Sequence, residues 1–384
     1  MTGMALSKSK MIEFRTQLVA IHRKLSWNKE WPPQSTINLE DLPTARQIFE
    51  PENLIVPEAK LISSNSETTL PASKLYCPAA WTARIPKGAA VGGTVLTPDN
   101  QAVITSIESW HDHGPPNNWL LPISRRNHHL NGSCLDIGKL IWATNYFHFL
   151  IDTLPHLAIL REAEWEPDWI LVYQNRSKFV DAIFQKMGLG KKIVYTSIRE
   201  RYKADEMLVC TMPNQRIGKY ESWGMNFLNQ VFKPEKESKK IRLFIDRSGT
   251  AVRKLKNQAQ MVEQLSKYNF VTVRLEEKTI QEQVNLFHNA ELIIAPHGAG
   301  LSNIAFCQPN TKIIELFSPE YVQTMYRKMA ARLQLPWLGV LGKGEMLYPD
   351  SVKRNILYRD PSLNKDIILE PELIDRALAW AFEK

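Results

Sequence analysis

The chain has 384 residues, of which 44% are hydrophobic and 23% are charged, a composition typical of a soluble globular protein with more than one domain. Its formal net charge is +8, which favours anionic ligands or membrane surfaces as partners. Neither a Lys/Arg block with interleaved aromatic residues nor an apolar run of about 18 residues occurs, which argues against nucleic acid and a membrane span and favours a cytoplasmic location.

The first predicted element is a basic amphipathic helix at residues 8–29. Met11, Phe14 and Leu18 recur at helical spacing between lysines and arginines. Such a helix either lies peripherally on the inner face of an anionic membrane or packs on the protein's own domain, and both alternatives stay open. Residues 30–74 are rich in Pro, Ser, Thr and Asn and predict an irregular arm, so 1–74 is treated as one segment.

Residues 75–232 predict an α/β domain that begins with a small antiparallel region. The segment GGTVLTPDNQAVITSIES indicates two strands around a PDN turn. A strand at about 134–141 then leads into an apolar helix, which starts near Asn145 and which Pro155 should kink or restart. Strands and helices alternate beyond it, which predicts a parallel sheet.

A charged, proline-containing linker at 233–240 separates this part from a second alternation of strands and helices at 241–345. The second alternation predicts a Rossmann-like domain. Residues 346–384 form a tail, and we expect its helix, at about 370–382, to pack back on the N-terminal domain. The predicted fold class is therefore α/β, with two Rossmann-like domains.

The segment IIAPHGAGLSNIAF predicts a phosphate-binding turn. A buried strand ends at Pro296, and the turn that begins with His297 leads into a helix. Glycines at 298 and 300 remove the Cβ atoms that would hold a diphosphate away from the backbone. The free N–H groups of a helix N-terminus suit phosphate, and His297 adds a donor. The alternative is a tight turn capped by Ser302, with no ligand.

A second segment, DRSGTAVRKLKN, places Arg247 just after a strand, with Arg253 and Asn257 at the start of the next helix. Strand ends of one parallel sheet lie along one edge, so we expect these side chains to face the same crevice as His297. Guanidinium groups there would neutralise a leaving diphosphate. Glu315 ends the following strand and could accept hydrogen bonds from ribose. A solvated basic helix start and an exposed carboxylate are the alternatives.

The apolar segment NYFHFLIDTLPHL predicts the catalytic base. His148 and Asp152 are four residues apart, so they share one face of a helix. Asp152 could accept a proton from an attacking hydroxyl, with His148 orienting it or acting as the base itself. A hydrogen-bonded core pair is the alternative. His156 extends the stripe, but Pro155 disturbs the geometry that a metal site would need.

Two further histidine clusters predict loops rather than a metal site. HDHG at 111–114 and the pair His128 and His129 are metal-like in composition but lack a convincing fourth ligand. No D-x-D occurs in the chain, so we expect a reaction without a bound metal.

These segments, in this order, resemble glycosyltransferase family 61 over roughly residues 75–335. The matching pieces are GGTVLTPDNQ, NYFHFLIDTLPHL, DRSGTAVRKLKN and PHGAGLSNIAFCQPNTKIIELF. The family pattern around the helix reads Asn-Tyr-x-His-Trp-x-x-Asp-x-x-Pro-Arg. Phe149 stands here for the Trp and His156 for the Arg, departures that concern contacts to the acceptor more than the donor site.

The resemblance implies a B-type glycosyltransferase, with two Rossmann-like domains facing a cleft, and an inverting transfer from a nucleotide-sugar, most often UDP-linked, to a glycan or glycolipid acceptor. It also implies a role in capsule or lipopolysaccharide synthesis. Asp152 with His148 would supply the base. The predicted donor-site residues are Arg247, Arg253, Asn257, His297, Gly298, Ala299, Gly300, Asn303 and Glu315. A nucleotide-sugar epimerase or hydrolase and a non-catalytic membrane-associated assembly subunit are the alternatives.

Overall fold

The computed structural model describes residues 17–18, 33, 35–105, 126–137, 145–173, 177–197, 199–213, 218–235, 239–250, 252–344 and 365–383. The chain divides into two compact units: unit 1 is Met1–Glu52 with Pro78–Ile217, and unit 2 is Asn53–Cys77 with Gly218–Lys384. These units do not coincide with the predicted ranges 1–74, 75–232, 241–345 and 346–384. Apart from residues 17 and 18, the predicted basic helix lies outside the described residues, as does the HDHG segment.

Unit 1 contains a ten-stranded mixed sheet. Its strands are β1 (Ser35–Asn38), β2 (Arg46–Phe49), β7 (Ala80–Pro86), β8 (Ala89–Val91), β9 (Thr94–Leu96), β10 (Gln101–Ile104), β11 (Arg126–Asp136), β12 (Trp169–Tyr173), β13 (Ile193–Thr196) and β14 (Glu200–Cys210). The last four are parallel and lie in the order β14-β11-β12-β13, which is half of a dinucleotide-binding sheet. β9 and β10 form the predicted antiparallel pair around the PDN turn.

The helices of unit 1 follow the parallel strands. They are a π-helical segment (His148–Thr153), α3 (His156–Glu162) and α4 (Lys178–Lys186), with short 3₁₀ turns at Leu39–Asp41 and Gly190–Lys192. The predicted break at Pro155 is confirmed, because the π-helical segment ends before this residue and α3 begins after it. Proline has no N–H and its ring clashes with the preceding turn, so the wider π-turn accommodates it.

The prediction of an irregular arm up to residue 74 is wrong for its described part, which forms strands in both units. In unit 1, β1 pairs with β10, with Ser35 opposite Gln101. In unit 2, β4 (Ala59–Ile62) pairs with β19 (Trp337–Leu341) and with β5 (Glu67–Leu70), while β3 (Glu52–Val56) pairs with β6 (Ser73–Cys77). These short strands are stabilised by partners far away in the sequence, which a local pattern does not reveal.

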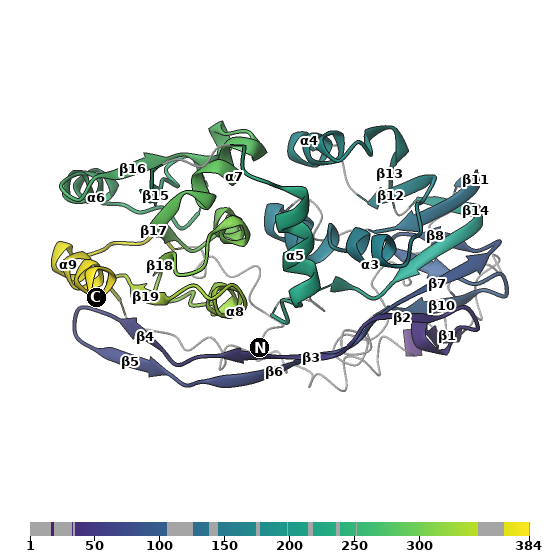
Figure 1. The fold of residues 1–384 in the computed structure, drawn as a ribbon, viewed down its shortest axis with the longest axis horizontal. Coiled ribbons are helices and arrows are strands. Elements are labelled where there is room, and N and C mark those ends of the chain that lie inside the picture. Colours follow the sequence, from purple (N-terminus) through teal and green to yellow (C-terminus); the bar gives the residue numbers. More distant parts are fainter. Residues whose placement is uncertain are drawn as a thin grey trace, which may run out of the picture. The chain divides into compact units, whose positions relative to one another are not determined.

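Unit 2 contains a seven-stranded sheet in the order β16-β15-β17-β18-β19-β4-β5. Its remaining elements are α5 (Ser222–Val231), β15 (Ile241–Ile245), α6 (Gln258–Ser266), β16 (Phe270–Val273), a 3₁₀ turn (Leu275–Glu277), α7 (Ile280–His288), β17 (Ala290–Pro296), the 3₁₀ helix η7 (Ala299–Phe306), β18 (Lys312–Phe317), α8 (Met325–Arg332) and α9 (Pro371–Phe382). The parallel strands β15–β19 have the order 2-1-3-4-5 of doubly wound folds. Figure 1 shows α6 and α9 on one face of this sheet and α7 and α8 on the other.

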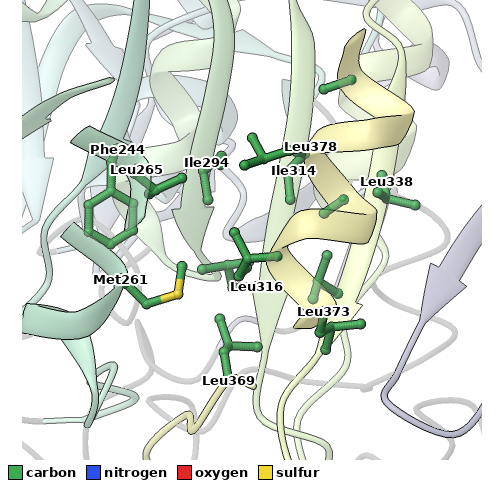
Figure 2. Close-up of a cluster of buried hydrophobic side chains, with 14 of the residues drawn as sticks. Phe244, Met261, Leu265, Ile294, Ile314, Leu316, Leu338, Leu369, Leu373 and Leu378 are labelled. Carbon is green, nitrogen blue, oxygen red and sulfur yellow. The ribbon is translucent and has the colours of Figure 1, made fainter. Parts of the chain in front are cut away.

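The expectation that the last helix packs on the N-terminal domain is wrong. Leu373, Ile374 and Leu378 of α9 are buried in one cluster with Phe244 and Ile314 of the unit 2 sheet (Figure 2). The physical reason is that this face of the sheet presents apolar side chains from every strand between β15 and β19, which α6 alone does not cover. Both units are therefore Rossmann-like α/β folds, as predicted.

Candidate functional site

The predicted phosphate-binding segments meet at one point of the unit 2 sheet. β15 lies between β16 and β17, so the chain reverses its direction of winding between β15 and β17. Arg247 follows β15, and His297 follows β17, which places both segments at the carboxyl ends of neighbouring parallel strands. Ligands of doubly wound sheets bind at this switch point.

The guanidinium group of Arg247 lies directly against the backbone of Gly298. A Cβ atom at position 298 would overlap Nη1 and Cζ of Arg247. The φ angle of Gly298 is 170°, an extended conformation open to any residue, so the glycine is required for space rather than for backbone freedom. The absence of a side chain at position 298 therefore allows the Arg247 guanidinium to lie against the turn.

His297 is held by a buried carboxylate. Its Nδ1 lies 2.5 Å from Oε1 of Glu315 on the adjacent strand β18, and Nε1 of Trp337 donates to Oε2 of Glu315 at 2.8 Å. Burial, followed by the charges of Arg253 and Arg247, lowers the pKa of His297 well below its ordinary value, and burial raises the pKa of Glu315 well above its own. Both shifts favour the neutral forms, in which the protonated carboxyl donates to Nδ1 and Nε2–H of the ring remains a donor.

The second cation, Arg253, joins the same group through an aromatic ring. Its Cζ lies 4.6 Å above the ring centre of Tyr321, and that ring centre is 5.4 Å from the ring centre of His297. Burial, with Arg253 as the second cause, lowers the pKa of Arg247. Within the described residues neither guanidinium forms an ion pair, and both Nε atoms are buried without a hydrogen-bond partner. The site thus holds two uncompensated cations.

The turn also offers backbone donors. η7 begins at Ala299, and the N–H groups of Gly298, Ala299 and Gly300 make no hydrogen bond to a described residue. The Tyr326 hydroxyl donates to the carbonyl of Gly298 at 2.8 Å, which fixes the turn. Unpaired N–H groups beside two guanidiniums form a site suited to an anion.

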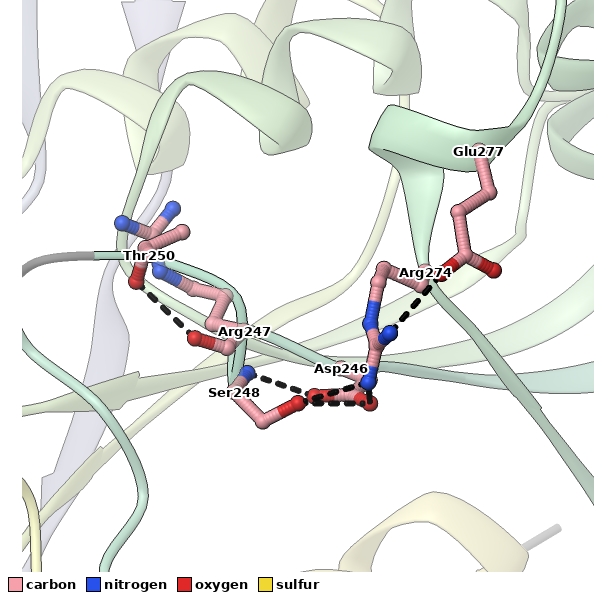
Figure 3. A network of polar contacts seen from close by, with 6 residues as sticks. All are labelled: Asp246, Arg247, Ser248, Thr250, Arg274 and Glu277. Atoms are coloured by element: carbon pink, nitrogen blue, oxygen red, sulfur yellow. Dashed lines mark hydrogen bonds and ion pairs between the residues drawn. The ribbon is translucent and has the colours of Figure 1, made fainter.

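A separate network holds the loop that carries Arg247 (Figure 3). Asp246 accepts hydrogen bonds from the Ser248 N–H at 2.6 Å and from Arg274 at 3.3 Å. Arg274 also binds Glu277 at 2.8 Å, and the Thr250 N–H and hydroxyl donate to the carbonyl of Arg247. Arg247 takes part in this network through its backbone carbonyl only, and its side chain contacts the turn at Gly298 instead.

Two predicted donor-site residues have structural contacts instead. The Asn257 amide donates to the carbonyl of Leu369 at 2.7 Å and accepts from the N–H of the same residue, so it ties the segment before α9 to α6. Asn303 is fully buried and donates to Gln283 and to the carbonyl of Gly300. Arg247, Arg253, His297, Gly298, Ala299, Gly300 and Glu315 remain as the cluster that the structure brings together.

The predicted base lies in unit 1, on the π-helical segment. Nδ1 of His148 lies 2.6 Å from Oδ2 of Asp152, and both side chains are buried. A carboxylate only accepts, so Nδ1 is the donor and Nε2 carries the lone pair. Single π-turns within helices are frequent at functional sites. This geometry, a histidine oriented by a carboxylate, is the arrangement of a general base.

His156 does not extend this pair into a metal site. Its Nδ1 lies 2.7 Å from the carbonyl oxygen of Thr153 in its own helical turn. In the described part of the chain no three His, Cys, Asp or Glu side chains come together around a possible metal position. The absence of metal from the reaction stays a prediction. A hollow of about 680 Å³ lies along α4 and β13, and neither His148 nor Asp152 lines it.

Sequence reasoning missed the aromatic residues around His297. The ring centres of Phe317, Tyr321 and Tyr326 each lie 5.4 Å from that of His297. All three follow Glu315 within one short stretch, ELFSPEYVQTMY, but nothing in their spacing marks them as neighbours of a turn that precedes them in the chain. Trp337 was likewise not predicted, nor was its strand β19.

A comparison with protein families gives one match. Residues 146–314 match the family model described as Glycosyltransferase 61, a span that includes His148, Asp152, Arg247 and His297. No curated protein matches the chain. No helix of the described residues is long and apolar enough to cross a membrane.

Two similar solved structures are both of the iron-containing dodecameric protein TibC. The glycosyltransferase TibC of enterotoxigenic E. coli H10407 is 11% identical, with 75% of this chain and 81% of that chain covered and a TM-score of 0.28. The heptosyltransferase TibC in complex with ADP-D-beta-D-heptose is 9% identical, with 83% and 86% covered and a TM-score of 0.31. At these TM-scores the similarities add nothing to the assignment.

Proposed function

We propose that the chain, whose residues 146–314 match the family model of glycosyltransferase 61, transfers a sugar with inversion from a nucleotide-sugar to a hydroxyl group of a glycan or glycolipid. The expected donor is UDP-linked, as the sequence predicts. The observation that carries the proposal is the glycine turn of unit 2. There the Arg247 guanidinium lies on Gly298, in a site with two uncompensated cations and unpaired N–H groups. A nucleoside diphosphate supplies the matching negative charge.

The proposed reaction is a single displacement. The acceptor hydroxyl loses its proton to Nε2 of His148, which Asp152 holds in the right tautomer, and the oxygen attacks the anomeric carbon. The bond to the diphosphate breaks at the same step. Arg247, Arg253 and the N–H groups at 298–300 stabilise the charge that develops on the leaving group, and Nε2–H of His297 adds a further donor.

This assignment moves the proton-accepting atom from the carboxylate of Asp152, the sequence-based hypothesis, to the imidazole that the carboxylate orients. A role in surface polysaccharide synthesis, capsule or lipopolysaccharide, is part of the proposal and rests on the family resemblance alone. The proposal also includes a reaction without bound metal, because no D-x-D occurs in the chain, a cytoplasmic location, and peripheral membrane contact through the basic amphipathic residues 8–29.

The decisive experiment is a thermal-shift screen of UDP-, ADP-, GDP- and CMP-linked sugars, followed by incubation of the stabilising donor with and without glycan acceptors. We expect stabilisation by one nucleotide class and sugar transfer only when an acceptor is present. Conversion of the donor to an isomer, or its hydrolysis at an unchanged rate with every acceptor, would assign the chain to the epimerases or hydrolases. No stabilisation by any nucleotide-sugar would refute donor binding.

A further inference from the structure

Unit 1 contains a basic cavity that is not lined by His148 or Asp152. It has a volume of about 250 Å³ and is lined by Lys87, Ala89, Thr97, Pro98, Asn100, Arg201 and Lys203. Arg201 and Lys203 are two residues apart on β14, so their side chains leave the same face of the sheet. Lys87 precedes β8, which pairs with this part of β14, with Ala89 opposite Lys203. Three cations therefore converge on one hollow.

The Asn100 side chain is the most informative member of this group. It is 9% exposed, and neither its amide nitrogen nor its amide oxygen has a hydrogen-bond partner. A buried amide without a hydrogen-bond partner is costly, because it has lost its contacts with water and gained none in return. Its backbone has a φ of 64°, in the left-handed region that asparagine and glycine adopt more readily than other residues. The amide lines the cavity, where a ligand would satisfy it.

Carboxylates nearby have other contacts. Asp99 accepts from the Thr97 hydroxyl at 2.6 Å, and Asp205 accepts from the Gly132 N–H at 2.7 Å. Lys87 forms no ion pair with a described residue and is exposed. A cavity with three cations and an amide donor matches an oxyanion with several oxygens.

We propose that this cavity binds a phosphate group, either a free phosphate or phosphomonoester or the phosphate of a lipid headgroup. The cavity volume of about 250 Å³ is several times the roughly 30 Å³ that one water molecule takes in the liquid, so the cavity is large enough for a phosphate group. The cavity is distinct from the proposed acceptor base. Arg201 and Lys203 lie near the amino end of β14, whereas the His148 segment follows the carboxyl end of the parallel strand β11. The inference therefore does not rest on the proposed function.

The test titrates inorganic phosphate by calorimetry into the full chain carrying Arg247→Ala, which removes the main cation of the proposed donor site. Into this background we place Lys87→Gln with Lys203→Gln, two exposed positions. The matched control is Lys178→Gln with Lys186→Gln, two exposed lysines of α4 with the same charge change. We expect at least roughly tenfold weaker phosphate binding in the cavity variant and less than twofold in the control, as for loss of a hydrogen bond to a charged group.

Asn100→Gly supplies a second variant, because glycine keeps the turn while removing the amide. We expect an unchanged midpoint of thermal unfolding and about tenfold weaker phosphate binding. A parallel arm measures co-sedimentation with phosphatidic acid vesicles and with phosphatidylcholine vesicles. If only phosphate responds to the cavity variants, the ligand is a soluble phosphate; if phosphatidic acid vesicles respond as well, it is a headgroup. Equal behaviour of cavity and control variants in both arms, or no binding of either probe, overturns the proposal.

Discussion

The two histidine–carboxylate pairs have the same contact in different surroundings. Nδ1 of His148 lies 2.6 Å from Asp152 within one helical turn, whereas Nδ1 of His297 lies 2.5 Å from Glu315 across two neighbouring strands. The first pair has an aromatic neighbour in Phe147, at 5.2 Å between ring centres, whereas the second is packed among three aromatic rings and accompanied by two guanidiniums without an ion pair in the described residues. The comparison teaches that the contact alone does not define a role: in the proposed reaction Nε2 of His148 accepts a proton, whereas Nε2–H of His297 donates to an anion.

The largest expected effect is on the pair of unit 1. Asp152→Asn should lower the rate of sugar transfer by roughly 10²- to 10⁴-fold, because an amide that donates to Nδ1 forces the proton onto Nε2 and removes the base. His148→Ala should have an effect of the same size. Transfer is measured by product formation, and nucleotide affinity by calorimetry should stay as in the unaltered protein.

Glu162→Gln is the control for this first prediction, since it removes an exposed carboxylate from the adjacent α3. It should leave the transfer rate within about twofold, as expected for a surface position. A transfer rate of Asp152→Asn equal to that of the unaltered protein would exclude the pair of unit 1 from the reaction. The His148–Asp152 contact would then be structural only.

The next effect concerns Arg247 and the glycine beneath it. Arg247→Ala should weaken binding of the nucleoside diphosphate by roughly tenfold to a hundredfold, the range for hydrogen bonds to charged groups. Gly298→Ala should do nearly the same, because its Cβ displaces the guanidinium. The double variant should bind no more weakly than Arg247→Ala, since both changes remove one interaction.

Gly190→Ala provides the matched glycine control, because the nearest atom to a Cβ there is an ordinary 3.4 Å away. Arg199→Ala is the matched control for Arg247→Ala, because it removes an exposed arginine. The affinity of all five variants for the nucleoside diphosphate is measured by calorimetry. Additive losses in the double variant would show that Gly298 and Arg247 act separately, against the contact described above.

The smallest effect is on stability as the pH changes. The raised pKa of Glu315 contributes stability that is complete below its ordinary value of 4.5 and is lost as the pH rises through the raised pKa. The lowered pKa of His297 contributes stability that is complete above 6.5 and is lost as the pH falls. The two slopes oppose each other where both groups titrate, and the loss from Glu315 amounts to up to about 1.4 kcal/mol per pH unit until the pH passes its raised pKa.

Glu315→Gln should abolish that decline, because a glutamine amide reproduces the neutral acid by donating to Nδ1 of His297 and accepting from Trp337. Chemical unfolding at several pH values measures it. A decline that persists unchanged in Glu315→Gln would mean that another group titrates and that the His297 pair is not neutral.

Much of unit 2 and half of its site could be predicted from the sequence, because the necessary signals are local. Alternating apolar strands and amphipathic helices specify the order of elements, and the capping box of Thr279 and Glu282 marks the start of α7 in the sequence itself. The glycine turn after β17 is equally local. The His148–Asp152 contact follows from a spacing of four residues.

The rest depends on contacts between distant segments. That Gly298 makes room for Arg247, or that Trp337 binds Glu315, follows only from the order of strands in the sheet. The sequence predicts Asn257 at the donor site because it follows basic residues, and its amide binds Leu369, more than a hundred residues away, a contact that the local pattern does not reveal. Periodicity says which residues are buried but not which element covers them, and for that reason α9 was placed on the wrong unit.

One consequence concerns the order of synthesis. The hairpin β4–β5 is made early, yet β4 joins the unit 2 sheet beside β19, with Lys60 opposite Leu338. Arg327 then donates to the carbonyls of Pro57 and Pro71 on either side of the hairpin. Translation proceeds at roughly 5–20 residues per second, so the hairpin leaves the ribosome many seconds before its partner strand exists. The hairpin must therefore wait without its partner strand β19 while residues 78–217 of unit 1 are made.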